Sequence, residues 1–248
     1  MPQQKQLKIL LIGDSCTDEY VYGTCERLNP EAPVPILNFK RKDTTKGMAW
    51  NVRENLMSFD MEVYIVTNQE DITKTRYIDE RYNQQILRVD DESLLKPMEY
   101  ELPEDKFDAL VISDYDKGFL TKEKIFELVE WFDGPVFIDS KKSELPDDCY
   151  IKVNDIEYGK LQTKNNNVII TKGGKGAEYK GKLYTGEDVK VFDAVGAGDT
   201  FLSALVYFYL LYGRIDKAIP YANKAASIAV QNFGTYVLTK EDVNEILC

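Results

Sequence analysis

The stretch 189–212, VKVFDAVGAGDTFLSALVYFYLLY, contains three patterns in succession. The run Val189–Phe192 predicts a strand, the glycine-rich segment after it predicts a tight turn, and the apolar run Thr200–Tyr212 predicts a helix that Gly213 ends. Strands that alternate with helices build α/β domains. The stretch therefore predicts a strand–turn–helix unit of an α/β fold.

The same turn places a carboxylate beside a predicted anion site. Gly196 and Gly198 allow the backbone to bend tightly and to approach a ligand closely. The free N–H groups and the dipole of the helix that follows attract an anion such as a phosphate. Asp199 is then placed to take a proton from a hydroxyl group during phosphoryl transfer. The plainer interpretation is a capped helix after a glycine turn, which a GxGD pattern alone would favour.

Further strands and helices extend this pattern along the whole chain. Continuous apolar runs are typical of strands covered on both faces, and they occur at Lys8–Gly13, Val63–Val66, Ala109–Ser113, Val136–Asp139, Ile151–Asn154 and Val168–Thr171. Helical spacing occurs at Thr121–Phe132, Ala218–Val230 and Thr239–Leu247. We expect one domain over residues 1–248, a three-layer αβα sandwich with a mostly parallel sheet.

Two polar segments do not fit that sheet. Residues 19–42 and 77–91 are charged and aromatic, with partial alternation, and we expect them to form exposed β-ribbons, a small β lid. Exposed strand edges are often covered by a ligand or by a second copy of the chain. We therefore expect a homodimer through the lid, although simple surface hairpins without a role are the alternative.

Composition excludes several kinds of protein. The formal charge is −11, which argues against binding to nucleic acid or to an anionic membrane. The chain has no His, so His-based nucleophile systems and His-ligated zinc are excluded. The four cysteines form no CxxC pair, which favours reduced thiols and a cytoplasmic protein. No stretch is long enough to span a bilayer.

The motifs resemble those of the PfkB/ribokinase sugar-kinase family. GAGDTF at 196–201 is similar to the family's second signature, NDIE at 154–157 to its N-x-x-E motif, and ITKGGKG at 170–176 to its nucleotide-site strand and loop. GMAWN at 47–51 resembles the first signature, and IGDSCTDEY at 12–20 resembles the opening strand with its substrate-contacting Asp. Their order and spread imply a ribokinase-like fold with a β lid.

A narrower resemblance points to one branch of the family. The segments RLNPEAPVPIL, TKTRYI, QQILRVDDE and SDYDKGFLT are similar to those of D-glycero-D-manno-heptose-7-phosphate kinases. This resemblance implies ATP-dependent phosphorylation of that sugar phosphate to the 1,7-bisphosphate, on the way to ADP-heptose and lipopolysaccharide. Many members carry a second, nucleotidyltransferase domain, and we expect none in these 248 residues.

The resemblance also implies roles for individual residues. Asp199 would be the catalytic base in the glycine turn, where the backbone of Gly196, Ala197 and Gly198 would stabilise the transferred phosphoryl group. ATP would be bound by Asn154, Glu157, Thr171, Gly173 and Gly174, and Mg²⁺ by Asn154 and Glu157 through water. The sugar would contact Asp14, Asp18, Gly47 and Asn51, and its phosphate would be bound by cations among Lys74, Arg76, Arg88, Lys117 and Lys141.

Three departures from the family pattern keep alternatives open. Met48 and Trp50 add bulk to the first signature, and Ala194 replaces a residue that often carries a hydroxyl group. After Val66 a helix and a strand of the family are missing, which would expose apolar surface. The alternatives are a kinase for another sugar and a degenerate kinase fold that serves as a binding subunit. A Rossmann dehydrogenase is not supported, because no GxGxxG follows the first strand.

Overall fold

The computed structural model describes residues 6–92, 94–163 and 166–247. They divide into two compact units. The sandwich unit comprises residues from 1–14, 48–68 and 95–248, and the β unit comprises 15–47 and residues from 69–94. The chain thus enters the β unit directly after Asp14.

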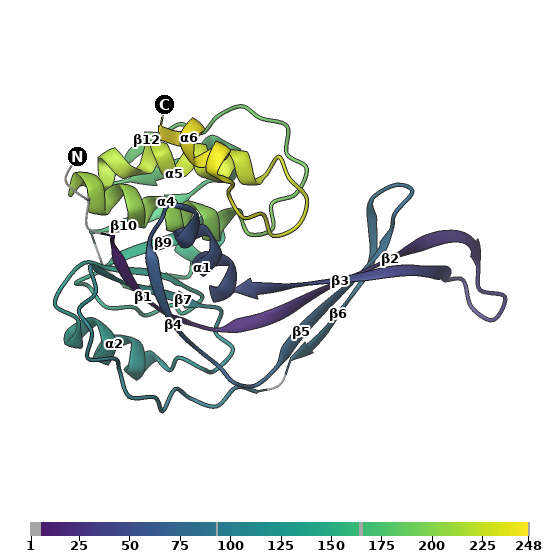
Figure 1. Ribbon diagram of the computed structural model, residues 1–248, viewed down its shortest axis with the longest axis horizontal. Coiled ribbons are helices and arrows are strands. Elements are labelled where there is room, and N and C mark those ends of the chain that lie inside the picture. The colour runs from purple at the N-terminus through teal and green to yellow at the C-terminus, as the bar shows by residue number, and fades with distance from the viewer. Residues whose placement is uncertain (1–5, 93, 164–165, 248) are drawn as a thin grey trace. The chain divides into compact units, whose positions relative to one another are not determined.

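The sandwich unit is built on an eight-stranded sheet among its described residues (Figure 1). Its strand order is β12-β11-β10-β9-β8-β7-β1-β4, and the six strands from β10 to β4 pair in parallel, whereas the hairpin β11–β12 is antiparallel. The bounds are β1 Lys8–Gly13, β4 Glu62–Thr67, β7 Ala109–Asp114, β8 Val136–Ser140, β9 Tyr150–Asn154, β10 Val168–Thr171, β11 Ala177–Tyr179 and β12 Lys182–Tyr184.

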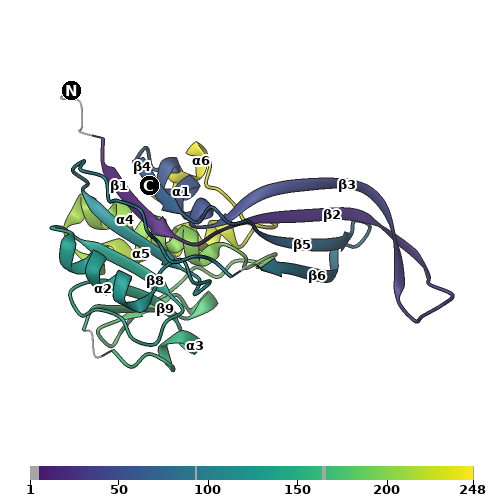
Figure 2. The same cartoon turned by 90° about the horizontal axis from the view of Figure 1, so that it is seen from below.

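Helices cover both faces of this sheet. Figures 1 and 2 show α2 on the face opposite to α1, α4 and α5. The latter three pack together over a core that includes Leu11, Val52, Phe201, Leu205 and Ala222, all of them buried. The bounds are α1 Ala49–Ser58, α2 Lys122–Trp131, α3 Asp155–Tyr158, α4 Ala197–Tyr212, α5 Ile215–Ala229 and α6 Lys240–Leu247, with a 3₁₀ turn at Gly173–Lys175. This arrangement confirms the ribokinase-like three-layer αβα sandwich.

Strand β4 forms one edge of the described sheet, and it directly precedes the point in the chain where a helix and a strand of the family were expected to be missing. After Thr67 the chain reaches strand β5 of the β unit at Ile72, with no further strand added to this edge of the described sheet. The side chain of Tyr64 on β4 is 49% exposed and contacts Phe107 with its ring. The shortened connection therefore leaves β4 as an edge strand of the described sheet, with Tyr64 half exposed while Val63 and Ile65 pack against the core.

The β unit contains both predicted ribbons in one four-stranded sheet of order β3-β2-β5-β6. Its strands are β2 Ser15–Leu28, β3 Pro35–Met48, β5 Ile72–Asp79 and β6 Gln84–Glu92. Strand β5 pairs in parallel with β2 and antiparallel with β6. Because this small sheet carries segments 19–42 and 77–91, the expected β-ribbons are present and share one sheet.

One predicted strand is wrong. Residues 189–192 form no strand, because the described sheet ends with the hairpin β11–β12, and the N–H groups of Phe192 and Asp193 instead donate to the carbonyl of Val230 at the end of α5. Helix α4 begins at Ala197, three residues before the predicted start. Among the described residues, no helix is long and apolar enough to cross a membrane.

Candidate active site

The glycine turn opens helix α4 toward a cavity. Gly196 is the N-cap residue, with a φ of 77° that favours glycine. A Cβ atom at Gly196 would lie 2.7 Å from the amide nitrogen of Asn51, and one at Gly198 would lie 2.7 Å from the ammonium of Lys152. Glycine at both positions therefore lets an amide and an ammonium group approach the helix start, where the N–H groups point at any bound anion.

Asp199 lies in the first turn of α4 and is only 4% exposed. Its Oδ2 accepts a hydrogen bond from Asn51 Nδ2 at 2.9 Å, and its Oδ1 accepts one from the Tyr115 hydroxyl at 2.9 Å. Burial raises the pKa of Asp199 to about 6, an effect to which the Asp139 charge adds and which these hydrogen bonds and Lys152 oppose. The carboxylate is thus oriented and has a pKa suited to accepting a proton.

A buried ion pair that was not predicted from the sequence lies beside this carboxylate. Lys152 Nζ in β9 lies 2.5 Å from Asp139 Oδ2 at the end of β8, and both residues are buried. Burial lowers the pKa of Lys152, but the charge and the hydrogen bond of Asp139 together with the charges of Asp199 and Glu157 outweigh it, so the pKa is raised and the side chain is a cation. A lysine within the otherwise apolar strand YIKVN was the sequence signal that could have identified it.

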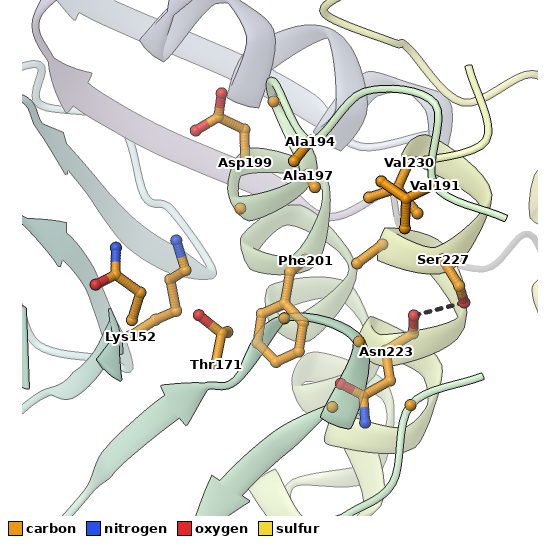
Figure 3. Close-up of a pocket in the computed structure, with 18 of the residues that line it drawn as sticks. Lys152, Thr171, Val191, Ala194, Ala197, Asp199, Phe201, Asn223, Ser227 and Val230 are labelled. Carbon is orange, nitrogen blue, oxygen red and sulfur yellow. Dashed lines mark hydrogen bonds between the residues drawn. The ribbon is translucent and has the colours of Figure 1, made fainter. Parts of the chain in front are cut away.

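A cavity of about 550 Å³ extends from this helix start. Figure 3 shows Lys152 and Thr171 on one side of it, with Val191, Asn223, Ser227 and Val230 on the other. All five residues predicted to bind ATP line it, namely Asn154, Glu157, Thr171, Gly173 and Gly174. The apolar wall suits a nucleobase, and the polar end suits its phosphates.

Asn154 and Glu157 cap the short helix α3 reciprocally. The Asn154 side chain accepts from the N–H groups of Ile156 and Glu157, and Glu157 Oε2 accepts from the Asn154 N–H at 2.9 Å. The other carboxylate oxygen of Glu157 forms an ion pair with Lys141. Both predicted metal-site residues therefore also have a structural role.

The residues present fit a sparse Mg²⁺ site. Within the described residues no group of three or more acidic or cysteine side chains is placed to hold a metal ion. Mg²⁺ in kinases is typically held by one or two carboxylates, water and the substrate phosphates. The carboxylates of Glu157 and Asp139, both in the wall of the cavity, could supply such a set together with ATP.

The predicted sugar-site residues fall in both units. Asp14, Asn51, Lys117 and Lys141 belong to the sandwich unit. Asp14 is fully buried, its Oδ1 has no hydrogen-bond partner among the described atoms, and burial followed by the charge of Asp114 raises its pKa to about 6. Lys141 lines the nucleotide cavity, so its position also suits an ATP phosphate. The sugar-binding roles of these residues stay predictions.

The other five, Asp18, Gly47, Lys74, Arg76 and Arg88, belong to the β unit. Lys74 and Arg76 are two residues apart on β5, so they lie on the same face of the sheet. Arg88 lies opposite Arg76 in the strand register and therefore shares this face, and Lys74 lies opposite Asp18. Each is paired with an acid: Arg76 with Asp18 at 2.5 Å, Arg88 with Asp90 at 2.6 Å and Lys74 with Glu92 at 3.6 Å. The sequence predicted the cations but not these partners.

Two positions of the first signature show close packing or strain. A Cβ atom at Gly47 would lie 2.1 Å from Asp18 Oδ2, so only glycine fits beside that carboxylate. Met48 has a φ of 56° and a ψ of −128°, a conformation that L-residues rarely adopt. Met48 thus retains a glycine-like backbone at the position where the resemblance expects glycine.

Comparison with known proteins agrees with this site. Residues 154–242, which include Asn154, Glu157 and the turn at Asp199, match the model of the pfkB family carbohydrate kinases. This part of the chain is therefore similar to the pfkB family. Over 96% of its length it is 28% identical to the bifunctional protein HldE of Nitratiruptor, and over 97% it is 28% identical to HldE of Helicobacter pylori.

The two HldE proteins are longer than this chain. The matches span 64% and 66% of the two HldE proteins, which is about two thirds of their length. The first alignment covers 299 positions, more than the 248 residues of this chain, so the chain lacks segments that the relative contains. This agrees with the shortened connection after β4.

Solved structures show the same fold. Ribokinase from Thermotoga maritima matches with a TM-score of 0.72 at 16% identity and covers 97% of this chain and 99% of its own. Arabidopsis thaliana ribokinase, solved with ribose and ATP, matches with a TM-score of 0.71 at 16% identity and covers 98% and 99%. At this identity the likeness concerns the fold alone.

Proposed function

We propose that this chain belongs to the pfkB family and is an ATP-dependent kinase that phosphorylates a hydroxyl group of a sugar phosphate, with D-glycero-D-manno-heptose 7-phosphate as the acceptor. The observation that carries the proposal is the position of Asp199: a buried carboxylate in the first turn of α4, held by two hydrogen bonds beside a cavity lined by the predicted ATP-binding residues. The product would be the 1,7-bisphosphate, a precursor of ADP-heptose for lipopolysaccharide.

In the proposed reaction, Asp199 takes the proton of the acceptor hydroxyl as its oxygen attacks the terminal phosphorus of ATP. A new O–P bond forms, the bond to the bridging oxygen breaks and ADP leaves. The N–H groups of Ala197 and Gly198 and the ammonium of Lys152 stabilise the negative charge on the transferred group. Mg²⁺, bound with ATP, would neutralise part of the phosphate charge.

The choice of a phosphorylated acceptor rests on two observations. Three cations share one face of the β unit, although the chain as a whole carries a charge of −11. The HldE proteins align with this chain over nearly its whole length. A kinase for another sugar is the second candidate, because Met48 and Trp50 change the first signature. A binding subunit without activity is disfavoured by the intact arrangement around Asp199.

A panel of acceptors tests the proposal. The purified chain is incubated with Mg²⁺, ATP and either heptose 7-phosphate, other sugar phosphates or free sugars, and product is identified by mass spectrometry. We expect the highest kcat/KM for heptose 7-phosphate. Equal or better use of an unphosphorylated sugar would overturn the acceptor assignment, and ATP binding without any product would favour the binding subunit.

The raised pKa of Asp199 predicts a pH dependence. A base must be deprotonated to act, and burial raises the pKa of Asp199 to about 6, so kcat/KM should decrease as the pH falls through about 6. The measurement is a profile of log kcat/KM against pH with saturating MgATP. A profile that stays level to well below pH 5, about one unit under this pKa, would contradict the assignment of Asp199 as the base.

We also propose that the β unit joins two copies of the chain. Strand β6 is exposed along its length and alternates Arg88 and Asp90 with the apolar Leu87 and Val89, whose side chains are 54% and 45% exposed. Apolar side chains in such a row favour burial against a partner. Light scattering should give a dimer, and Leu87→Lys with Val89→Lys should give a monomer; a wild-type monomer at high concentration would refute the dimer.

A further inference from the structure

The two groups that hydrogen-bond Asp199 come from distant segments that meet at Asp14. Asn51 lies in the first turn of α1, and the N–H group of Ala49, the first residue of that helix, donates to the Asp14 carbonyl at 3.0 Å. Tyr115 follows strand β7, and its N–H group donates to Asp14 Oδ2 at 2.6 Å. Asp14 therefore contacts the backbone of both segments.

Hydrogen bonds to the neighbouring backbone fix the position of Asp14. It directly follows β1, and its N–H group donates to the Ser113 carbonyl in the neighbouring strand β7 at 3.1 Å. A Cβ atom at Gly13 would lie 2.0 Å from the same carbonyl, so glycine permits the close approach of these strands. A second N–H group, that of Lys117, donates to Asp14 Oδ2 at 3.3 Å. The carboxylate thus closes the turn that carries Tyr115.

The Tyr115 ring is directed by this turn toward the base. Its hydroxyl donates to Asp199 Oδ1, and the ammonium of Lys141 lies 5.6 Å from the centre of its ring. The backbone hydrogen bonds to Asp14 fix one end of Tyr115, while the hydroxyl contacts Asp199 at the other. Removing the hydroxyl would leave Asn51 as the remaining side-chain hydrogen-bond donor to the Asp199 carboxylate among the described residues.

We propose that Tyr115 is a positioning residue for the Asp199 carboxylate and that Asp14 acts on the base through Tyr115. The proposal rests on the proposed function of Asp199 and adds a chain of contacts, from the end of β1 through the turn after β7 to the first turn of α4. In this chain Tyr115 donates a hydrogen bond to the base and transfers no proton to the substrate.

The electrostatic surroundings explain why the hydroxyl matters. Burial raises the pKa of Asp199, the Asp139 carboxylate on β8 raises it further, and Asn51 on α1, Lys152 on β9 and Tyr115 lower it. A hydrogen bond donated to a carboxylate stabilises its charged form, so the loss of the Tyr115 hydroxyl would raise the pKa of the base, by about one unit. Part of the carboxylate would then be protonated, and inactive as a base, at neutral pH.

The test is Tyr115→Phe, with Tyr150→Phe as a matched control. Tyr150 also loses one hydroxyl hydrogen bond, to Tyr209 at 3.1 Å, but does not contact Asp199. We expect Tyr115→Phe to shift the midpoint of the acid limb of the kcat/KM profile upward by about one pH unit, which lowers kcat/KM by about twofold at pH 7 and by about tenfold at pH 5, with the KM for ATP unchanged. Tyr150→Phe should leave the midpoint of the acid limb of the kcat/KM profile unchanged.

A second readout does not depend on activity. Carbon-13 NMR follows the titration of the Asp199 carboxyl, which is assigned by difference from Asp199→Asn, and Tyr115→Phe should raise its midpoint by about one pH unit. If the wild type phosphorylates no acceptor, the proposed function fails, whereas this midpoint still tests the position of Tyr115. An unchanged midpoint would overturn the proposal.

Asp14→Asn tests the first step of the contact chain. If Asp14 acts through Tyr115, Asp14→Asn should also shift the midpoint of the acid limb of the kcat/KM profile to higher pH. The double variant with Tyr115→Phe should then show a shift no larger than the greater of the two single shifts. Additive shifts would contradict action through Tyr115. Circular dichroism of each variant checks folding, and the NMR midpoint of Tyr115→Phe keeps the proposal testable if Asp14→Asn does not fold.

Discussion

Asp199→Asn should lower kcat by about 10²–10⁴-fold, the contribution that a general base typically makes. The amide has nearly the same shape as the carboxylate and its single oxygen can still accept one of the two hydrogen bonds, from Asn51 or from Tyr115, but it cannot take a proton at neutral pH. Since the side chain is buried in the first turn of α4, no exposed acid can replace it easily. The measurement is the steady-state rate of ADP formation with a saturating acceptor.

The control for this variant is Asp216→Asn, an isosteric change in the first turn of α5 at a surface ion pair with Arg214. Surface pairs contribute little, so this control should keep full activity. Both variants should bind ATP as the wild type does, because the cavity wall is unchanged. A fully active Asp199→Asn variant would show that another group removes the proton.

Lys152→Met should have the second large effect, on both stability and phosphoryl transfer. The substitution leaves the buried carboxylate of Asp139 without its cation, and breaking a buried ion pair in this way costs about 3–5 kcal/mol. It also removes the ammonium at the start of α4, next to Gly198. We expect a lower free energy of unfolding in urea and a strongly reduced kcat.

A double variant separates these two effects. In Lys152→Met with Asp139→Leu, both charges are replaced by apolar side chains, a change that is often neutral for stability. We expect the free energy of unfolding to recover while kcat remains low, because the variant lacks both the cation for the transferred phosphoryl group and a carboxylate of the proposed Mg²⁺ set. Recovery of kcat together with stability would show that the ion pair has a structural role only.

Local patterns predicted most of the sandwich unit. The six parallel strands were recognised because buried strands of such a sheet are continuous apolar runs, as in KILLIG of β1 and ALVIS of β7. The glycine turn was recognised because its function depends on residues adjacent in sequence. The run Val189–Phe192 misled because its composition resembles a strand, although Val191 and Phe192 are largely exposed.

The contacts that complete the site are long-range and therefore left little trace in the sequence. Asn51 and Tyr115 reach Asp199 from positions 148 and 84 residues away. The pairing of Arg76 with Asp18 depends on the register of β2 against β5, which alternation alone does not determine. Charges can be listed from sequence, but their partners become visible only once strand order is known.

The most direct test of the account compares phosphorus NMR spectra of MgATP and heptose 7-phosphate mixed with the wild type or with Asp199→Asn. The account predicts that the wild type converts ATP to ADP while one new sugar phosphate signal appears for each ADP formed, and that the variant binds ATP but leaves the spectrum unchanged. Phosphate transfer at equal rates by both proteins, or none by a folded wild type that binds both ligands, would contradict it.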